Sequence, residues 1–298
     1  MTEGNDVESF LDEDFLRKLE KLKVMAQKGI RGPHRGEHIS WRSGASLDFL
    51  DYRKYQAGDD FRYIDWNVYG RLDKLFIKLF RAEEDLTIHF LLDMSRSMGE
   101  GNPPKHTYAK KVVAALCYIG LASLDRVGVT AFTRGLGESK SPERGKQVYL
   151  SVLRYLLSLR PEGNTDLNAS LKEYASTHKR PGVVIIISDL LDPKGFDEGV
   201  EALIAGSFDI TLIQMLDRDE LFPSFEGYVT LSDIETGESK KITLDGALLD
   251  FHRKKMRDFL ENIKSFCFKN GVDYYFSETS TPFEDFLLDY LVKGSLFH

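Results

Sequence analysis

The sequence predicts an α/β protein built on a mostly parallel sheet that is flanked by helices. From residue 86 onward, candidate strands alternate with candidate helices, as expected for strands joined by helical crossovers. The candidate strands at 183–188 and 208–214 contain consecutive apolar residues, which a strand needs when both of its faces are buried. The chain has 298 residues, 42% of them hydrophobic, so it is long enough to bury such a sheet.

The elements of this sheet follow one another closely. Apolar runs between turn residues predict strands, and apolar residues at every third or fourth position predict helices. The predicted strands are 86–92, 127–132, 183–188, 208–214 and 272–276. The predicted helices are 105–124, 145–159 and 167–178, then a long helix from Leu248 to Gly271 and a final one over about 283–292.

The first 83 residues have a different pattern. Apolar residues recur at helical spacing between Phe15 and Met25 and predict an amphipathic entry helix. Short aromatic runs separated by glycines and charged residues within 30–81 predict short strands and loops rather than helix. We therefore expect an N-terminal segment of residues 1–83, with a helix and a β-rich part, and an α/β domain of residues 84–298.

Two smaller features complete this organisation. Short candidate strands on either side of a Gly-containing turn predict a β-hairpin inserted at about 226–245. The two cysteines, Cys117 and Cys267, lie in apolar helical patterns. We expect buried thiols in a reducing compartment rather than a disulfide.

The charge pattern limits the classes of partner. A net charge of −7 argues against a surface dominated by nucleic-acid binding. However, residues 15–81 contain 15 Lys and Arg against 8 Asp and Glu, which leaves two interpretations open: internal ion pairs on a solvated face, or a docking surface for an acidic partner. The chain contains no signal-peptide pattern and no apolar run near the ~18 residues of a membrane span, so we expect a cytoplasmic protein.

The most informative motif follows the first predicted strand of the sheet. Asp93, Ser95 and Ser97 stand at alternate positions directly after an apolar run. In an open parallel sheet, ligands bind outside the carboxyl ends of the strands. Carboxylate and hydroxyl oxygens completed by water are what Mg²⁺ prefers, so this loop predicts a site for a hard cation.

Two further segments strengthen this prediction. Thr165 precedes a predicted helix and offers a third hydroxyl, and Asp189 follows the apolar strand 183–187 and offers a second carboxylate. Both segments lie where the rim of a parallel sheet could gather them beside Asp93. The alternative for each residue is local, because serines after a strand often cap the next helix and Asp189 could cap its neighbour.

The order of these loops resembles the von Willebrand factor A domain, which has a metal-ion-dependent adhesion site and a Rossmann-like fold. The resemblance spans roughly residues 84–293. It implies that the hydroxyls ligate Mg²⁺, with Mn²⁺ or Ca²⁺ as alternatives, and that the aspartates act through waters or hydrogen bonds. It also implies an open position for the Asp or Glu of a partner protein. The implied metal-site residues are Asp93, Ser95, Ser97, Thr165 and Asp189.

The N-terminal segment carries a more specific motif. It contains the string Gly58-Asp59-Asp60-Phe61-Arg62-Tyr63-Ile64-Asp65-Trp66, after an aromatic block that begins near Gly44. This resembles the signature of the bacterial family called domain of unknown function 58. The resemblance implies a soluble, chaperone-like interaction protein that works with a MoxR-type AAA+ ATPase in the assembly or activation of a protein complex.

The charged residues of this segment also allow a structural interpretation. Arg53, Arg62 and Arg71 alternate with aspartates, and the planar guanidinium group suits paired hydrogen bonds to carboxylates. We expect a structural network, with a direct binding surface as the alternative. Nucleic-acid binding by this basic, aromatic segment is a less favoured alternative, because its acidic residues are interleaved with the basic ones.

The sequence favours an interaction module over an enzyme. It contains no Gly-x-Ser-x-Gly, phosphate-loop or His-Glu-x-x-His motif, and His89 lies inside a strand, where we expect a packed core residue. A Mg²⁺-dependent phosphohydrolase with Asp93 as nucleophile is the alternative. Such an enzyme usually has a second aspartate two positions later, where this chain has Ser95.

Overall fold

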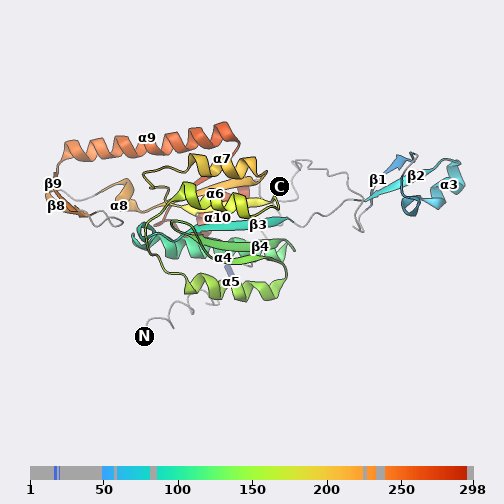
Figure 1. Ribbon diagram of the computed structural model, residues 1–298, viewed down its shortest axis with the longest axis horizontal. Helices are drawn as coiled ribbons and strands as arrows, with labels where there is room; N and C mark the ends of the chain where they lie inside the picture. The colour runs from blue at the N-terminus through green and yellow to red at the C-terminus, as the bar shows by residue number, and fades with distance from the viewer. Residues whose placement is uncertain are drawn as a thin grey trace. The chain divides into compact units, whose positions relative to one another are not determined.

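The computed structural model describes residues 49–56, 59–80, 86–223, 227–232 and 239–293, together with Arg17, Lys18 and Glu20 (Figure 1). The chain divides into two compact units, one of residues Arg35–Asp85 and the other of Met1–His34 with Leu86–His298. The predicted entry helix lies largely outside the described residues. No helix in the described ranges is long and apolar enough to cross a membrane.

The larger unit contains a six-stranded, mostly parallel sheet, as predicted. Its order is β10-β7-β6-β3-β4-β5, and only the edge strand β5 runs antiparallel to its neighbour. The strands are β3 (Thr87–Asp93), β4 (Arg126–Phe132), β5 (Leu136–Glu143), β6 (Val183–Ser188), β7 (Asp209–Leu216) and β10 (Asp273–Glu278).

Helices cover both faces of this sheet (Figure 1). One apolar cluster joins alternate β3 residues, among them Phe90, to α4, α5 and α10, and the other joins Leu91 and its neighbours on β6 to α6, α7 and α9. The helices are α4 (Lys105–Ala122), α5 (Lys146–Ser158), α6 (Leu167–Thr177), α7 (Asp197–Ala205), α9 (Gly246–Asn270) and α10 (Phe283–Lys293). The two cysteines are buried and free, which confirms the prediction of buried thiols rather than a disulfide.

The connections after two adjacent strands diverge at one end of the sheet. The chain leaves β3 for α4 on one face, whereas it leaves the adjacent β6 for α7 on the opposite face. Ligand sites in open α/β sheets form where neighbouring connections diverge in this way, outside the carboxyl ends of the strands. The loops after β3 and β6 therefore flank the point at which a site is expected.

The structure adds elements that the sequence did not predict. β5 lacks an apolar face because it is an exposed edge strand, so it lacked the pattern of a core strand. α7 has only nine residues, and the short helix α8 (Arg218–Leu221) is held by a capping box from Asp217. The hairpin predicted at about 226–245, by contrast, is confirmed: β8 (Gly227–Ser232) pairs antiparallel with β9 (Ser239–Leu244) before α9. Figure 1 shows α8 and this hairpin at one end of the sheet.

The smaller unit corrects one prediction. β1 (Phe49–Lys54) pairs antiparallel with β2 (Phe76–Phe80), but the chain between them forms a 3-10 turn, η1 (Phe61–Tyr63), and a helix, α3 (Trp66–Leu72), where strands and loops were expected. The helix forms because the Asp65 carboxylate accepts hydrogen bonds from the first free amides, those of Asn67 and Val68. The aromatic residues of this stretch concealed the capping signal.

The aspartates of this unit make local polar contacts. Arg53 pairs with Asp59 at 2.8 Å, and Arg62 pairs with Asp60 at 2.7 Å. Asp65 instead accepts from the Tyr52 hydroxyl at 2.8 Å and lies 3.1 Å from the Lys78 ammonium. The hydrogen bond from Tyr52 is the main reason that the pKa of Asp65 falls to about 2. These contacts fit the predicted structural network.

His89 is a core residue, as predicted. Its ring is 3% exposed, and its Nδ1 lies 2.6 Å from the Tyr174 hydroxyl. The rings of Tyr174 and His178 stack at 3.9 Å, and Phe208 contacts His89 edge-on. Burial, assisted by the nearby charge of His178, lowers the pKa of His89 to about 4.

We expect this histidine to destabilise the protein in acid. The pKa of His89 is about 4 in the folded state, below the unfolded value of about 6.5. The contribution of neutral His89 to the free energy of unfolding is therefore fully present above pH 6.5 and is lost as the pH falls toward 4. The total loss is at most about 3 kcal/mol. Urea unfolding between pH 4 and 7.5 should show a smaller loss in His89→Gln than in the wild type. Equal losses in the two proteins would contradict this assignment.

Candidate functional site

The structure brings the predicted loops together at the divergence of β3 and β6. Asp93 is the last residue of β3, Ser188 is the last of β6, and Asp189 follows it. The loop that contains Thr165 is tied to the β3 loop by two backbone bonds, from Glu162 to Met94 and from Arg96 to Gly163. Three segments distant in sequence thus meet at one rim.

Asp93 forms the floor of this rim. Its side chain has no exposed surface, and its Oδ2 accepts a 2.6 Å hydrogen bond from the Ser188 hydroxyl. Its Oδ1 accepts from the backbone amide of Ser95 at 2.9 Å, which fixes the start of the loop. Burial, and then the negative charge of Asp189, raise the pKa of Asp93 to about 7.

The hydroxyls of the two serines lie close together, and that of Ser97 contacts Asp189. The Oγ atoms of Ser95 and Ser97 are 3.1 Å apart, and Ser97 donates to Asp189 Oδ2 at 2.8 Å. Ser95 stands at the start of the short 3-10 helix η2 (Arg96–Gly99), but its side chain makes no capping bond there. The alternative that Ser95 serves only as a helix cap is therefore not what the structure shows.

Thr165 is 8% exposed and directly precedes Asp166, which caps α6 by accepting from the amide of Ala169. The same connection is held from the β6 side, because Asp192 accepts from the amide of Leu167 at 2.9 Å. The capping role at this helix therefore belongs to Asp166, and Thr165 lies on the loop that borders Ser95 and Ser97.

The turn that follows β6 is strained and strongly held. Leu190 has a φ of 60°, in the left-handed region that favours glycine. Its amide donates to Ser188 Oγ, and the next amide, of Leu191, donates to Asp189 Oδ1. Gln214 of β7 also donates to the Asp189 carbonyl at 3.0 Å. Both the backbone and the carboxylate of Asp189 are therefore fixed in place.

Sequence reasoning missed a buried lysine at this site. Lys105 is the first residue of α4, its side chain has no exposed surface, and its Nζ lies 2.8 Å from Asp189 Oδ2. The same ammonium contacts Glu220 of α8. Burial acts to lower the pKa of Lys105, but the charges of Asp189 and Glu220 outweigh it, so the pKa is raised and the side chain is ionised.

Glu220 and Asp217 link the site to α8. Glu220 Oε2 accepts from the amide of Asp217 at 2.8 Å, and Asp217 Oδ1 accepts from the amide of Asn102 and the hydroxyl of Thr279, both at 3.1 Å. Asp217 directly follows the apolar strand β7, so the strand-end rule that selected Asp93 could have found it. The spacing of the sequence gave no comparable signal for Lys105.

The chemistry of the rim fits a divalent cation. Asp93 and Asp189 are both at most 1% exposed, and burial, followed by the negative charge of Asp189, raises the pKa of Asp93. Hydroxyl oxygens face the same place. In the described ranges, no group of three or more His, Cys, Asp or Glu side chains is arranged to hold a metal, so a site here would depend on Ser and Thr oxygens.

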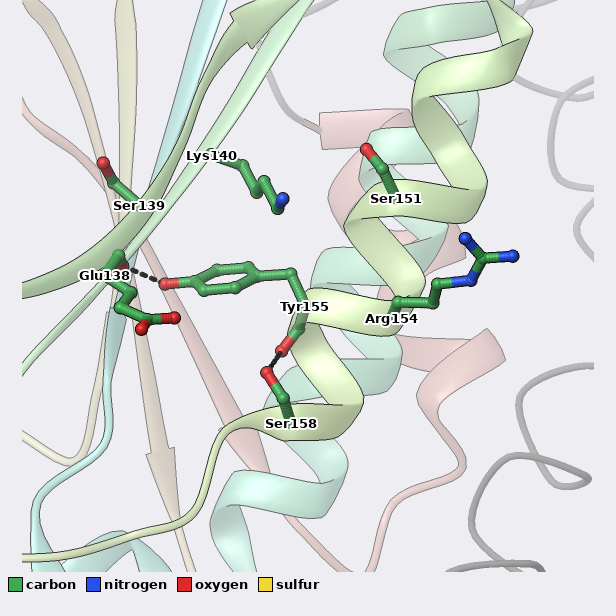
Figure 2. A pocket seen from close by; sticks show the side chains of 7 residues that line it. All are labelled: Glu138, Ser139, Lys140, Ser151, Arg154, Tyr155 and Ser158. Atoms are coloured by element: carbon green, nitrogen blue, oxygen red, sulfur yellow. Dashed lines mark hydrogen bonds between the residues drawn. The ribbon is translucent and has the colours of Figure 1, made fainter.

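A separate groove lies between the edge strand β5 and α5 (Figure 2). Its polar side chains are mostly engaged locally: the Tyr155 hydroxyl donates to the Glu138 carbonyl, and the Ser151 and Ser158 hydroxyls donate to carbonyls of their own helix. Figure 2 shows the Arg154 guanidinium pointing away from Tyr155. The groove contains none of the predicted site residues.

Comparison with known proteins gives relatives of similar length. The Uncharacterized protein Rv1480 of Mycobacterium tuberculosis is 28% identical over 239 residues, which cover 78% of this chain and 74% of the relative. A protein of Mycobacterium bovis, Uncharacterized protein Mb1516, matches to the same extent.

Among solved structures, an aerotolerance-related membrane protein from Bacteroides fragilis aligns with a TM-score of 0.44 at 16% identity, covering 70% of this chain and 99% of that one. The conserved hypothetical protein BatB from Bacteroides thetaiotaomicron aligns with a TM-score of 0.43 at 14% identity, covering 70% and 98%.

A family model provides the assignment. Residues 51–258 match the family described as Protein of unknown function DUF58, and this range is more than half of the chain. It includes most of the small unit and the whole rim from Asp93 to Glu220. The chain therefore belongs to the DUF58 family.

Proposed function

We propose that this protein is a Mg²⁺-dependent protein–protein interaction module whose larger unit is a von Willebrand factor A-like domain. The observation that carries the proposal is the meeting of Ser95, Ser97 and Asp189 at the carboxyl ends of adjacent parallel strands, in contact through hydrogen bonds of 3.1 and 2.8 Å. Three loops supply oxygens of the kind that a hard cation needs.

In this proposal the hydroxyls of Ser95, Ser97 and Thr165 hold the cation, and Asp93 and Asp189 orient them. When bound, the metal supplies an open position at which a carboxylate of a partner exchanges with water. The chain's own contribution is to fix the two carboxylates by hydrogen bonds. The Ser188 hydroxyl donates to Asp93, and the amide of Leu191 donates to Asp189.

The geometry favours binding over hydrolysis. An aspartyl nucleophile needs an oxygen that faces the substrate, but both oxygens of Asp93 accept hydrogen bonds inside a fully buried environment. The hydroxyl-rich ligand set also carries little negative charge and leaves the metal electrophilic. Both features suit the capture of an acidic side chain from another protein.

For the partner we propose a MoxR-type AAA+ ATPase, with the pair acting in the assembly or activation of a protein complex, in the bacterial cytoplasm. Family membership supports this choice of partner through the resemblance described above. The ion pairs within the small unit favour a structural role for its charges over nucleic-acid binding, because Arg53 and Arg62 already contact carboxylates.

We expect Mg²⁺ or Mn²⁺ to raise the melting temperature of chelator-stripped protein. A ligand that binds only the folded state stabilises it by about 2.7 kcal/mol at a hundred times its Kd. Ser97→Ala and Thr165→Ala should reduce this shift strongly, as measured by thermal unfolding with and without metal.

Ser170→Ala is the matched control for these variants. Ser170 is also a buried hydroxyl, but it lies within α6 and donates to the Thr133 carbonyl at 3.0 Å, so this change should lower stability slightly and leave the metal-induced shift intact. A wild-type melting curve that does not respond to metal would refute the site.

We expect binding of the purified chain to a MoxR-type ATPase from the same genome to require divalent metal. Pull-down should succeed with Mg²⁺, fail with chelator, and weaken at least tenfold with Thr165→Ala while Ser170→Ala binds normally. Equal binding with metal and with chelator would contradict a metal-mediated contact. Turnover of phosphate esters that is lost in Asp93→Asn would instead favour the hydrolase alternative.

A further inference from the structure

The site contains a cation of its own, the Lys105 ammonium. We propose that Lys105 acts as a tethered antagonist of the metal: it occupies the Asp189 side of the rim, lowers the affinity for divalent cations, and couples metal binding to α8 through Glu220. This inference rests on the proposed function, because it concerns the same rim.

The position of the ammonium is the first observation. Asp189 Oδ2 accepts hydrogen bonds from Ser97 Oγ and from Lys105 Nζ, each at 2.8 Å. The ammonium is therefore one shared oxygen away from a proposed metal-binding hydroxyl. A carboxylate oxygen bound to an ammonium has less negative charge to offer a metal or its waters.

Burial makes this charge effective. The side chain of Lys105 is 0% exposed and that of Asp189 is 1% exposed, so little water screens the repulsion between an ammonium and a divalent ion at the rim. A lysine at the first position of a helix also opposes the helix dipole, which makes it costly there on structural grounds alone. The ion pairs with Asp189 and Glu220 offset this cost and keep the ammonium at the rim.

Glu220 provides the alternative partner. It contacts the same ammonium, but its side chain is 26% exposed and belongs to α8, a helix of four residues. When a bound metal ion attracts the Asp189 carboxylate, the Lys105 ammonium keeps its ion pair with the second carboxylate, that of Glu220. Glu220 and Asp217 form the capping box at the start of α8. A stronger attraction between the ammonium and Glu220 therefore acts directly on the start of this helix.

A purely structural role for Lys105 gives the opposite expectation. If the ammonium only holds Asp189 in position for the metal, its removal should loosen that carboxylate and weaken metal binding. If it competes with the metal, its removal should strengthen binding. The sign of the change in Kd therefore separates the two roles.

The experiment is calorimetric titration of chelator-stripped full-length protein with Mg²⁺ and with Mn²⁺. We expect Lys105→Met to lower the Kd at least tenfold, and Glu220→Gln to raise it, because the ammonium then loses a counter-charge. The matched control is Lys110→Met, which removes another buried lysine of α4 whose Nζ donates to the Leu159 carbonyl at 2.7 Å. Its Kd should match that of the wild type.

The double variant Lys105→Met with Glu220→Gln removes one positive and one negative charge, so the net charge of the site is unchanged. It replaces the single variant if Lys105→Met does not fold. It too should bind metal more tightly than the wild type. An unchanged or higher Kd in folded Lys105→Met, or in the double variant, would overturn the inference while leaving the metal site intact. An absence of metal binding in every folded protein would refute the proposed function itself. Binding tighter than that of the wild type in every folded variant that lacks Lys105 would support the antagonism.

Discussion

The hydrogen bond between Ser188 and Asp93 is the contact on which the rest of the rim depends. It joins the carboxyl ends of β3 and β6, the two central strands whose connections leave to opposite faces of the sheet. It satisfies a carboxylate that has no access to water, and such a group is costly to leave without partners. Asp93 also accepts from the amide of Ser95, and Ser188 also accepts from the amide of Leu190. The Ser188–Asp93 bond therefore fixes the start of the Ser95 loop to the strained turn at Leu190.

Charge sets the second constraint. The ammonium of Lys105 contacts Asp189 and Glu220, whereas Asp93 accepts hydrogen bonds from Ser95 and Ser188. Burial is the main reason that the pKa of Asp93 is raised, and the negative charge of Asp189 adds to it. When Asp93, Asp189, Glu220 and Lys105 are all ionised, three carboxylates and one ammonium leave a net charge of −2, which one divalent cation beside the serines would balance.

The parallel sheet and its helices could be predicted because their signals are local: continuous apolar runs and helical spacing identified most strands and helices to within two residues. The loops of the candidate site followed from one rule about strand ends. The positions of Lys105 and Glu220 beside Asp189 could not be predicted, because tertiary packing brings them there from two separate helices, α4 and α8. The helix α3 was missed for a different reason, because one cap at Asp65 outweighed the aromatic pattern that indicated strands.

These two kinds of residue have different physical tasks. Asp93, Ser95 and Ser97 lie on one short loop, and their spacing alone places three oxygens within a few residues of a strand end. Lys105 and Glu220 reach Asp189 only once the fold is complete, because their helices must pack before the ammonium can contact both carboxylates. In the proposed site, a short oxygen-rich loop supplies the capacity to bind a cation, and the buried charges that the rest of the fold brings to it set the affinity. Proteins that share the loop can therefore differ widely in metal affinity, depending on what stands beside the second carboxylate.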